Sequence, residues 1–195
     1  MLESILALDA YNIHILLEEI FLDKGIINMY QEVITPLLTQ IGELWQLNTL
    51  NIAHEHLFSN ILREFIISKS NEIKKQKHGK KVILFLHEDE EHEIPLLFYH
   101  YMLNDKGWNC FYLGQKVPLA DFEKSYYQIN PDLVLTSMIK STSSKQFSKV
   151  LDRLIEVIPA QKLVLSGYNV ITYKNKIPKG IATIRILSDF TKIFN

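Results

Sequence analysis

The chain has 195 residues, with 21 Lys and Arg against 22 Asp and Glu, so its formal net charge is -1. Hydrophobic residues make up 47% and charged residues 22%, a globular composition that excludes a disordered chain. The balanced charge argues against a chain that grips nucleic acid itself, and the single cysteine excludes an internal disulfide and a Cys-rich metal site. No apolar run reaches the length of a membrane span, so we expect no membrane association and a cytoplasmic protein.

Charge is distributed unevenly along the chain. The segment through Lys75 holds ten acidic and five basic residues, whereas the rest of the chain has a net charge of +4. The change falls in a polar, lysine-rich stretch at residues 69–81. Because cations favour the last turn of a helix, this stretch is more typical of a helix end and a solvated linker than of an anion-binding patch. We therefore predict two domains, residues 1–76 and residues 80–195.

Before the linker, apolar residues recur at three- and four-residue steps, which is the spacing of one helix face. The three stripes are Ile13, Leu16, Leu17, Ile20 and Phe21; Leu37, Leu38, Ile41, Leu44 and Trp45; and Leu57, Ile61, Leu62, Phe65 and Ile66. We expect Gly25 to end the first helix, Pro36 to open or kink the second, and Asn51 to cap the third. Short loops between such helices predict a four-helix cap bundle.

After the linker, short apolar runs alternate with amphipathic stretches. Strands are predicted at 81–86, 108–113, 133–137, 162–165 and 181–186, and helices at 95–106, 119–129, 144–158 and 188–194. The side chains expected to face inward from the helix 144–158 are Phe147, Val150, Leu151, Leu154 and Ile155. This alternation predicts a doubly wound α/β domain, and for five parallel strands the flavodoxin-like order 2-1-3-4-5.

In an open parallel sheet, ligands bind beyond the carboxyl ends of the strands. The loops expected at this edge are 87–93, 114–118, 137–140 and 166–168. The first of them places His87 and His92 among five carboxylates, a group that could bind a divalent metal. Its spacing matches no common metalloenzyme motif, and such acidic loops are usually solvated. No glycine-rich dinucleotide or P-loop motif follows the first strand, which disfavours those phosphate ligands.

Several motifs together carry a family resemblance. They are Ile41-Gly42-Glu43-Leu44-Trp45 followed by Asn51-Ile52-Ala53-His54-Glu55-His56, then Glu90-Glu91-His92-Glu93-Ile94, then Tyr112-Leu113-Gly114-Gln115 with Pro118-Leu119, and Ser137. In this order they resemble the cobalamin-binding region of light-sensing MerR-type transcriptional regulators. The resemblance spans nearly the whole chain. It implies a helical cap over a Rossmann-like domain, with the corrin ring of a cobalamin held between them.

The resemblance also implies roles for residues of the sheet domain. His92 would be the lower axial ligand of cobalt, and Glu90 would orient its imidazole through the other ring nitrogen. Gly114 falls in a corrinoid-binding loop of the family. The residues that would line the slot for the nucleotide tail are Ser137, Ser166 and Gly167.

In the cap, the resemblance places Trp45 over the upper axial face of the corrin ring. Glu55 and His56 would contact the upper ligand, which is adenosyl in the light-sensing relatives, so adenosylcobalamin is the expected cofactor. The residues themselves leave a second interpretation open. Trp45 alone is equally consistent with a core aromatic of the bundle, and the run 54–56 with a polar face near a helix N-terminus.

Three functions remain open from the sequence. The first is a sensor domain, not an enzyme, that binds cobalamin and sets the state of a homo-oligomer, with DNA bound only through a separate N-terminal helix-turn-helix domain absent from this chain. The second is a degenerate apo regulator or interaction module, because Pro95, Ser166 and Gln46 stand where the family has Gly, Gly and His. The third is a corrinoid carrier protein of a methyltransferase system.

Overall fold

The computed structural model describes residues 1–47, 49–74 and 78–194 of the chain. They divide into two compact units, Met1–Ile73 and Lys74–Asn195. Helix α4, at the end of the first unit, runs from Ile52 to Glu72 and so includes the first residues of the polar stretch 69–81. Residues 75–77 of that stretch, where the linker was predicted, lie outside the described residues.

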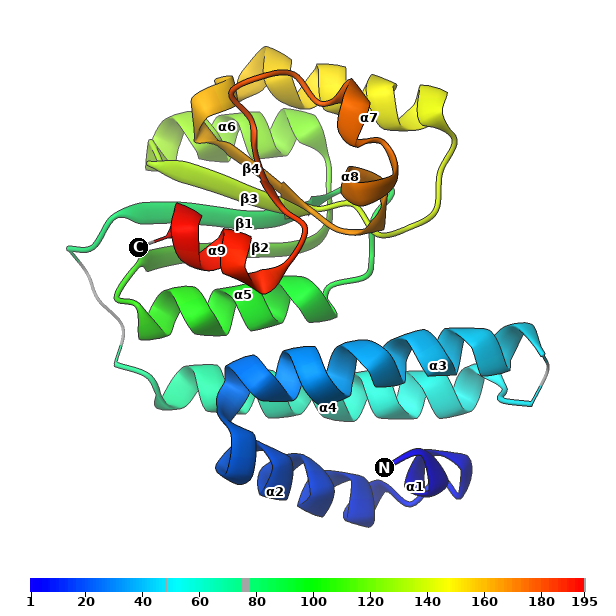
Figure 1. Ribbon diagram of the computed structural model, residues 1–195. Helices are drawn as coiled ribbons and strands as arrows, with labels where there is room; N and C mark the ends of the chain where they lie inside the picture. Colours follow the sequence, from blue (N-terminus) through cyan, green and yellow to red (C-terminus); the bar gives the residue numbers. More distant parts are fainter. Residues whose placement is uncertain (48, 75–77, 195) are drawn as a thin grey trace. The chain divides into compact units, whose positions relative to one another are not determined.

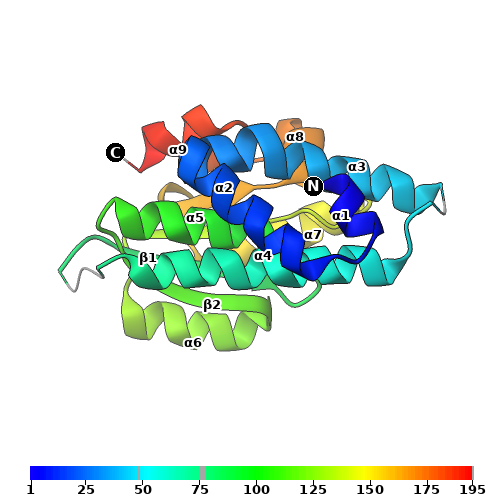
Figure 2. The same ribbon diagram turned by 90° about the horizontal axis from the view of Figure 1, so that it is seen from below.

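The first unit is entirely helical (Figures 1 and 2). Its elements in chain order are α1 (Leu2–Leu6), α2 (Ala10–Asn28), the π-helix η1 (Met29–Ile34), α3 (Thr35–Gln46) and α4 (Ile52–Glu72). Helix α4 packs against α2 and α1, and α3 packs against η1. The side chains that fill this core include Leu17, Ile41, Phe58, Leu62 and Ile66, each almost completely buried. The predicted helical cap bundle is confirmed, with α1 as an additional short helix.

Of the three predicted helix signals in this unit, Pro36 and Asn51 act as expected, and the prediction that Gly25 ends the first helix is wrong. Gly25 has φ 69°, so its backbone breaks the regular geometry of α2, but the chain resumes a helical path to Asn28 and on into η1. Pro36 lies in the first turn of α3, where a missing N–H costs no hydrogen bond. Asn51 caps α4 by accepting hydrogen bonds from the backbone N–H groups of Ala53 and His54. Gly25 thus kinks the helical path rather than ending it.

The second unit is a five-stranded parallel sheet in the order β2-β1-β3-β4-β5, as predicted. The strands are β1 (Lys81–His87), β2 (Asn109–Val117), β3 (Leu133–Ser137), β4 (Leu163–Ser166) and β5 (Ala182–Ile184). The helices are α5 (Ile94–Asp105), α6 (Leu119–Ile129), α7 (Ser144–Val157), α8 (Tyr168–Thr172) and α9 (Leu187–Ile193), with 3-10 turns η2 (Ala160–Lys162) and η3 (Lys174–Lys176). Helices α6 and α7 cover one face of the sheet and α5 and α9 the other (Figure 1).

Alternate side chains of the strands enter separate cores on the two faces. On the α6 and α7 face, Phe85 of β1 stacks on Phe122 of α6 with ring centroids 4.0 Å apart, and Phe147 of α7 joins the same cluster. On the other face, Tyr99 of α5 stacks on Phe190 of α9. These aromatic contacts fix the positions of the helices against the strands and therefore the geometry of the loops at the sheet edge.

Two predictions about this unit are wrong in detail. Ile155 of α7 is 36% exposed, because the buried stripe continues from Leu154 to Ile158 and Ile155 lies about 100° around the helix from Leu154. Strand β2 continues to Val117, through residues expected to form a loop. Its register against β1 shifts between Leu84 and Phe85, which lets the strand extend past Gly114.

In the part of the chain that the structure describes, no helix is both long enough and apolar enough to cross a bilayer.

Candidate functional site

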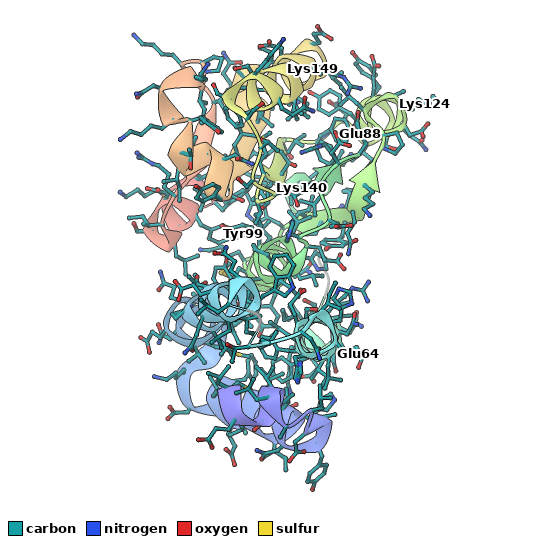
Figure 3. The ribbon with its side chains drawn as sticks, turned by 90° about the vertical axis from the view of Figure 1, so that its right-hand side faces the viewer. Glu64, Glu88, Tyr99, Lys124, Lys140 and Lys149 are labelled. Atoms are coloured by element: carbon teal, nitrogen blue, oxygen red, sulfur yellow. The ribbon has the colours of Figure 1, made fainter. Side chains whose placement is uncertain are left out.

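The carboxyl edge of the sheet gathers the loops that follow β1, β3 and β4, and Figure 3 views the molecule from that side. Glu90, in the loop after β1, is 1% exposed. Its Oε1 accepts hydrogen bonds from the backbone N–H groups of Glu91 and His92, each at 3.0 Å. Its Oε2 accepts from the backbone N–H groups of Ile139 and Lys140 after β3, at 2.6 and 2.8 Å. One buried carboxylate therefore ties two loops together.

The electrostatics of Glu90 follow from these donors. Burial by itself raises the pKa of this carboxyl group, because charge is costly away from water. The hydrogen bonds from the His92 side chain and from the backbone N–H groups of His92, Lys140 and Ile139 outweigh burial and lower the pKa of Glu90 to about 2. Glu90 is therefore a permanent anion at neutral pH.

His92 is held by this anion. Its Nδ1 lies 2.6 Å from Oε1 of Glu90, while half of its side-chain surface is exposed. Because a carboxylate can only accept, Nδ1 carries the proton of a neutral ring and the lone pair of that ring resides on Nε2. A carboxylate that fixes the tautomer in this way is the usual support of a metal-bound histidine. The predicted Glu90–His92 pair is present in the structure.

The end of β2 also reaches this loop. The backbone N–H of Lys116 donates to the carbonyl oxygen of Glu90 at 3.2 Å, and the Lys116 side chain forms an ion pair with Glu91. Gly114 lies within β2, opposite Phe85, with φ 81°, a conformation that favours glycine. The structure thus places Gly114 in an irregular stretch of strand next to the Glu90 loop rather than in a loop of its own.

The predicted residues of the tail slot meet at the ends of β3 and β4. Ser137 and Ser166 are register partners, both buried, and their hydroxyl oxygens lie 2.6 Å apart. Gly167, with φ 101°, packs so closely on Met138, the residue that follows β3, that an added Cβ would lie 2.7 Å from the Met138 carbonyl oxygen. A side chain at position 167 is therefore excluded by space as well as by backbone conformation.

His87 is in a different environment from His92. It is buried at the end of β1, and its Nδ1 accepts a hydrogen bond from the backbone N–H of Asp89 at 3.3 Å. Burial lowers the pKa of His87 below its ordinary value of 6.5, although the carboxylates of Glu90, Asp89 and Glu88 act in the opposite direction. No group of three or more His, Cys, Asp or Glu side chains that could hold a metal ion occurs among the described residues. The open alternative of a multi-residue metal site in this loop gains no support.

The predicted cap residues lie at the C-terminal end of α3 and in the first turns of α4. Trp45 is 55% exposed, so it is not a core aromatic of the bundle. His56 and Glu55, in the first turns of α4, form a loose ion pair of 4.0 Å between Nε2 and Oε2. His54 has a structural role, because its Nδ1 lies 2.7 Å from Oδ1 of Asn51 in the helix cap. Trp45 and His56 therefore present their side chains to solvent in this unit.

Sequence reasoning missed the groups that hold the carboxylate in place. The N–H groups of Ile139 and Lys140 belong to the backbone, so no particular residue type in the sequence could have predicted them. Asn169 of α8 supports the same loop by donating a hydrogen bond from Nδ2 to the carbonyl oxygen of Lys140 at 2.8 Å. The one signal in the sequence that could have revealed this contact is the amide side chain of Asn169, two positions after Gly167.

The helical unit has a match among known protein families. Residues 1–67 match the family described as B12 binding domain. The matched segment lies within the helical unit and makes up about a third of the chain. Of the motifs that carry the resemblance, the two in the helical unit, at 41–45 and 51–56, fall inside the matched segment, whereas those from Glu90 to Ser137 lie beyond it. The family match and the curated relatives together confirm the resemblance to the cobalamin-binding region of MerR-type regulators.

Two curated relatives extend the similarity into the sheet domain. The HTH-type transcriptional repressor CarH of Myxococcus xanthus is 32% identical over 161 residues, which are 82% of this chain and 53% of the relative. The HTH-type transcriptional repressor CarA of the same organism is 26% identical over 132 residues, 68% of this chain and 44% of the relative. The chain therefore spans about half the length of the curated relatives that it matches.

Among solved structures, the monomethylamine corrinoid protein of Methanosarcina barkeri has the same fold. The TM-score is 0.76, and the match covers 98% of this chain and 93% of that chain. At 17% sequence identity, this similarity concerns the fold alone. It confirms the helical cap followed by a five-stranded Rossmann-like domain.

The residues present fit the B12-type cofactor that the family implies. An imidazole can ligate cobalt only through an unprotonated nitrogen, and Glu90 holds His92 in the tautomer that carries its lone pair on Nε2. Gly167 leaves its backbone bare, because neither its φ angle nor the space beside Met138 admits a side chain. Pro95, at the start of α5, opens the helix and lies two residues beyond the Glu93 N-cap, so the ring occupies a position that a helix tolerates.

Proposed function

We propose that this chain is the cobalamin-sensing domain of a transcriptional regulator, with His92 as the lower axial ligand of cobalt. The observation that carries the proposal is the buried Glu90 carboxylate, which is fixed by four backbone N–H groups and holds Nδ1 of His92 at 2.6 Å. A bound cobalamin supplies a cobalt centre whose upper bond to carbon can be broken or exchanged. The chain supplies the ligand and its orientation.

The other residues in the proposal have separate tasks. Ser137, Ser166 and Gly167 line the slot for the nucleotide tail, and Gly114, in the irregular end of β2, adjoins the corrinoid. In the cap, Trp45 covers the upper face, and Glu55 and His56 contact the upper ligand. The exposure of Trp45 supports this, because burying a large aromatic against a ligand releases water that its surface now orders. Adenosylcobalamin is the form that we propose.

The regulator role rests on the curated relatives, two of which are named as HTH-type transcriptional repressors. In this role the chain is not an enzyme. We assign DNA binding to a separate helix-turn-helix domain of the whole protein. Occupancy of the cobalamin site in this chain controls the state of a homo-oligomer. The cytoplasm is the compartment that this role requires.

The corrinoid-carrier alternative differs in its preferred upper ligand. A methyl carrier should bind methylcobalamin at least as tightly as adenosylcobalamin, whereas the proposed sensor should prefer the adenosyl form because Glu55 and His56 contact that group. Affinities of the chain for the two forms, measured in the dark, separate these functions. A preference for methylcobalamin would favour the carrier.

Gel filtration after mixing with adenosylcobalamin in the dark tests binding. We expect the corrinoid absorption to elute with the protein, and His92→Ala to shift the spectrum of the bound form. The matched control is His14→Ala, which removes an exposed imidazole of α2 and should leave both elution and spectrum unchanged. Separate elution of protein and of every cobalamin tested would leave the degenerate apo regulator as the better description.

A further inference from the structure

A pocket lies on the α6 and α7 side of the sheet edge, within the second unit. Its volume is about 170 Å³, and its apolar wall is formed by Met138, Phe147 and Val150. Its polar wall includes His87, Thr142 and Asn169. Glu90 of the proposed lower-ligand pair also lines the pocket, with Asp89, Lys140 and Gln146, whereas the residues of the tail slot do not. At roughly 30 Å³ for each water molecule, the pocket has room for a molecule of about five or six non-hydrogen atoms.

Two polar atoms of this pocket have no hydrogen-bond partner in the described part of the chain. Asn169 is 2% exposed, and its Nδ2 is engaged by the carbonyl oxygen of Lys140, but its Oδ1 is unpartnered. The buried hydroxyl of Thr142 is also unpartnered. Buried polar atoms are almost always satisfied in native proteins, and these two belong to residues that line the pocket, so they are the acceptors available to a ligand that donates a hydrogen bond.

The remaining polar side chain defines the opposite end of the ligand. Because Nδ1 of His87 accepts from the Asp89 N–H, the neutral ring carries its proton on Nε2 and can donate from there. Glu90 also borders the pocket, but its oxygens already accept five hydrogen bonds. Carboxylates of Glu90 and Asp89 and the ammonium group of Lys140 thus all border the pocket, and charges of both signs beside an apolar wall favour a neutral, dipolar ligand over a charged one.

We propose that this pocket binds a small, neutral primary carboxamide. The N–H of the ligand donates to Oδ1 of Asn169, its carbonyl oxygen accepts from Nε2 of His87, and the Thr142 hydroxyl serves either atom. The short alkyl part of the ligand packs against Met138, Phe147 and Val150. All the lining residues belong to the second unit, so binding of the carboxamide can be tested on the chain without cobalamin.

Titration of the isotope-labelled chain with propionamide, followed by NMR, tests the proposal. Few atoms are available for contact, so we expect a Kd in the millimolar range, with the largest shifts at the backbone amides of Thr142, Gln146 and Asn169. Propionate and propylammonium have similar size but carry charge, and they should bind more weakly by roughly tenfold. The absence of saturable shifts with propionamide, or equal binding of the three probes, would overturn the proposal.

Two threonine variants make the test independent of folding. Thr142→Val removes a hydroxyl that has no protein partner, so it should keep the fold and weaken propionamide binding roughly fivefold. Thr136→Val is the matched control, because the Thr136 hydroxyl is equally buried and unpartnered but does not line the pocket. Equal affinity in the two variants would contradict the assignment of Thr142.

The carboxamide could be a free molecule or one of the side-chain amides that surround a corrin ring. Repeating the propionamide titration with cobalamin present distinguishes the two sources. Loss of the propionamide shifts assigns the pocket to the corrinoid, and unchanged shifts assign it to a free carboxamide. Both results support the carboxamide chemistry of the pocket.

Discussion

The Glu90 carboxylate joins the loops after β1 and β3 and sets the proton position of His92. Of these partners, the acid and the imidazole were predicted through the family resemblance of the motif that contains them. The amide donors of Ile139 and Lys140 were not predictable, because almost every residue has a backbone N–H and only the fold determines where it points. The same holds for the pairing of Ser137 with Ser166, which depends on the register between β3 and β4.

Acidification of the chain without cofactor should expose the contribution of Glu90. Its pKa is about 2 in the folded protein and 4.5 in its ordinary state, which corresponds to about 3 kcal/mol of stability at neutral pH. Because the folded pKa is lowered, this stability is present above pH 4.5 and is lost as the pH falls toward about 2. Urea unfolding across this range should show a smaller pH dependence in Glu90→Gln. Identical pH profiles of variant and unaltered chain would contradict the description of Glu90.

His87 should remain neutral below the pH at which an ordinary histidine becomes charged. Burial is the main cause of its lowered pKa, so folding disfavours the protonated ring and stability falls as the pH drops below 6.5. An NMR titration of the histidine ring signals should place the midpoint of His87 below 6.5. A midpoint at or above that value would show that the surrounding carboxylates outweigh burial.

The two tryptophans should respond differently to truncation. Trp45 is 55% exposed, whereas Trp108 is 7% exposed and packs edge-on against Phe194. Trp108→Ala should lower the free energy of unfolding by about 3 kcal/mol or more, and Trp45→Ala by less than about 1 kcal/mol. Trp45→Ala should instead weaken cobalamin binding. A large loss of stability in Trp45→Ala would return this residue to a core role.

At the scale of elements, the periodic stripes predicted the helices and strands well, since burial of one face is what holds each of them. The departures occur where local geometry overrides the pattern. Gly25 kinks α2 without ending the helical path, and β2 runs on past Gly114 because a register shift absorbs the irregular residues. Neither feature changes the spacing of the hydrophobic residues, so neither could be predicted from that spacing.

The turn between β4 and α8 should tolerate only glycine at position 167. Gly167→Ala forces a Cβ to within 2.7 Å of the Met138 carbonyl oxygen in a backbone conformation with φ 101°. We expect a loss of about 2–4 kcal/mol in the free energy of unfolding, measured by urea titration. Gly180→Ala is a suitable control, because its φ is also positive but its nearest contact is a side chain at 3.7 Å. Equal losses would mean that backbone conformation alone, and not the close approach, sets the cost.

At the scale of the whole molecule, the order of cap and sheet domain was predictable because their hydrophobic patterns differ in period. The strand order followed from the general behaviour of doubly wound sheets. Function was not predictable from composition, and it entered only through a few residues, chiefly Trp45, Glu90 and His92. The match of residues 1–67 to the B12 binding domain family supports that interpretation for the cap. Cobalt ligation in the sheet domain remains the central proposal.

The most direct test of that proposal is the electron paramagnetic resonance spectrum of the chain reconstituted with cob(II)alamin. A nitrogen below the cobalt splits each line into a triplet, and uniform nitrogen-15 labelling of the protein should convert these triplets into doublets if a protein imidazole is the ligand. We predict this conversion for the unaltered chain and for His14→Ala, and its loss in His92→Ala. Triplets that persist in the labelled chain would show that the nucleotide base of the cobalamin, not His92, ligates the cobalt.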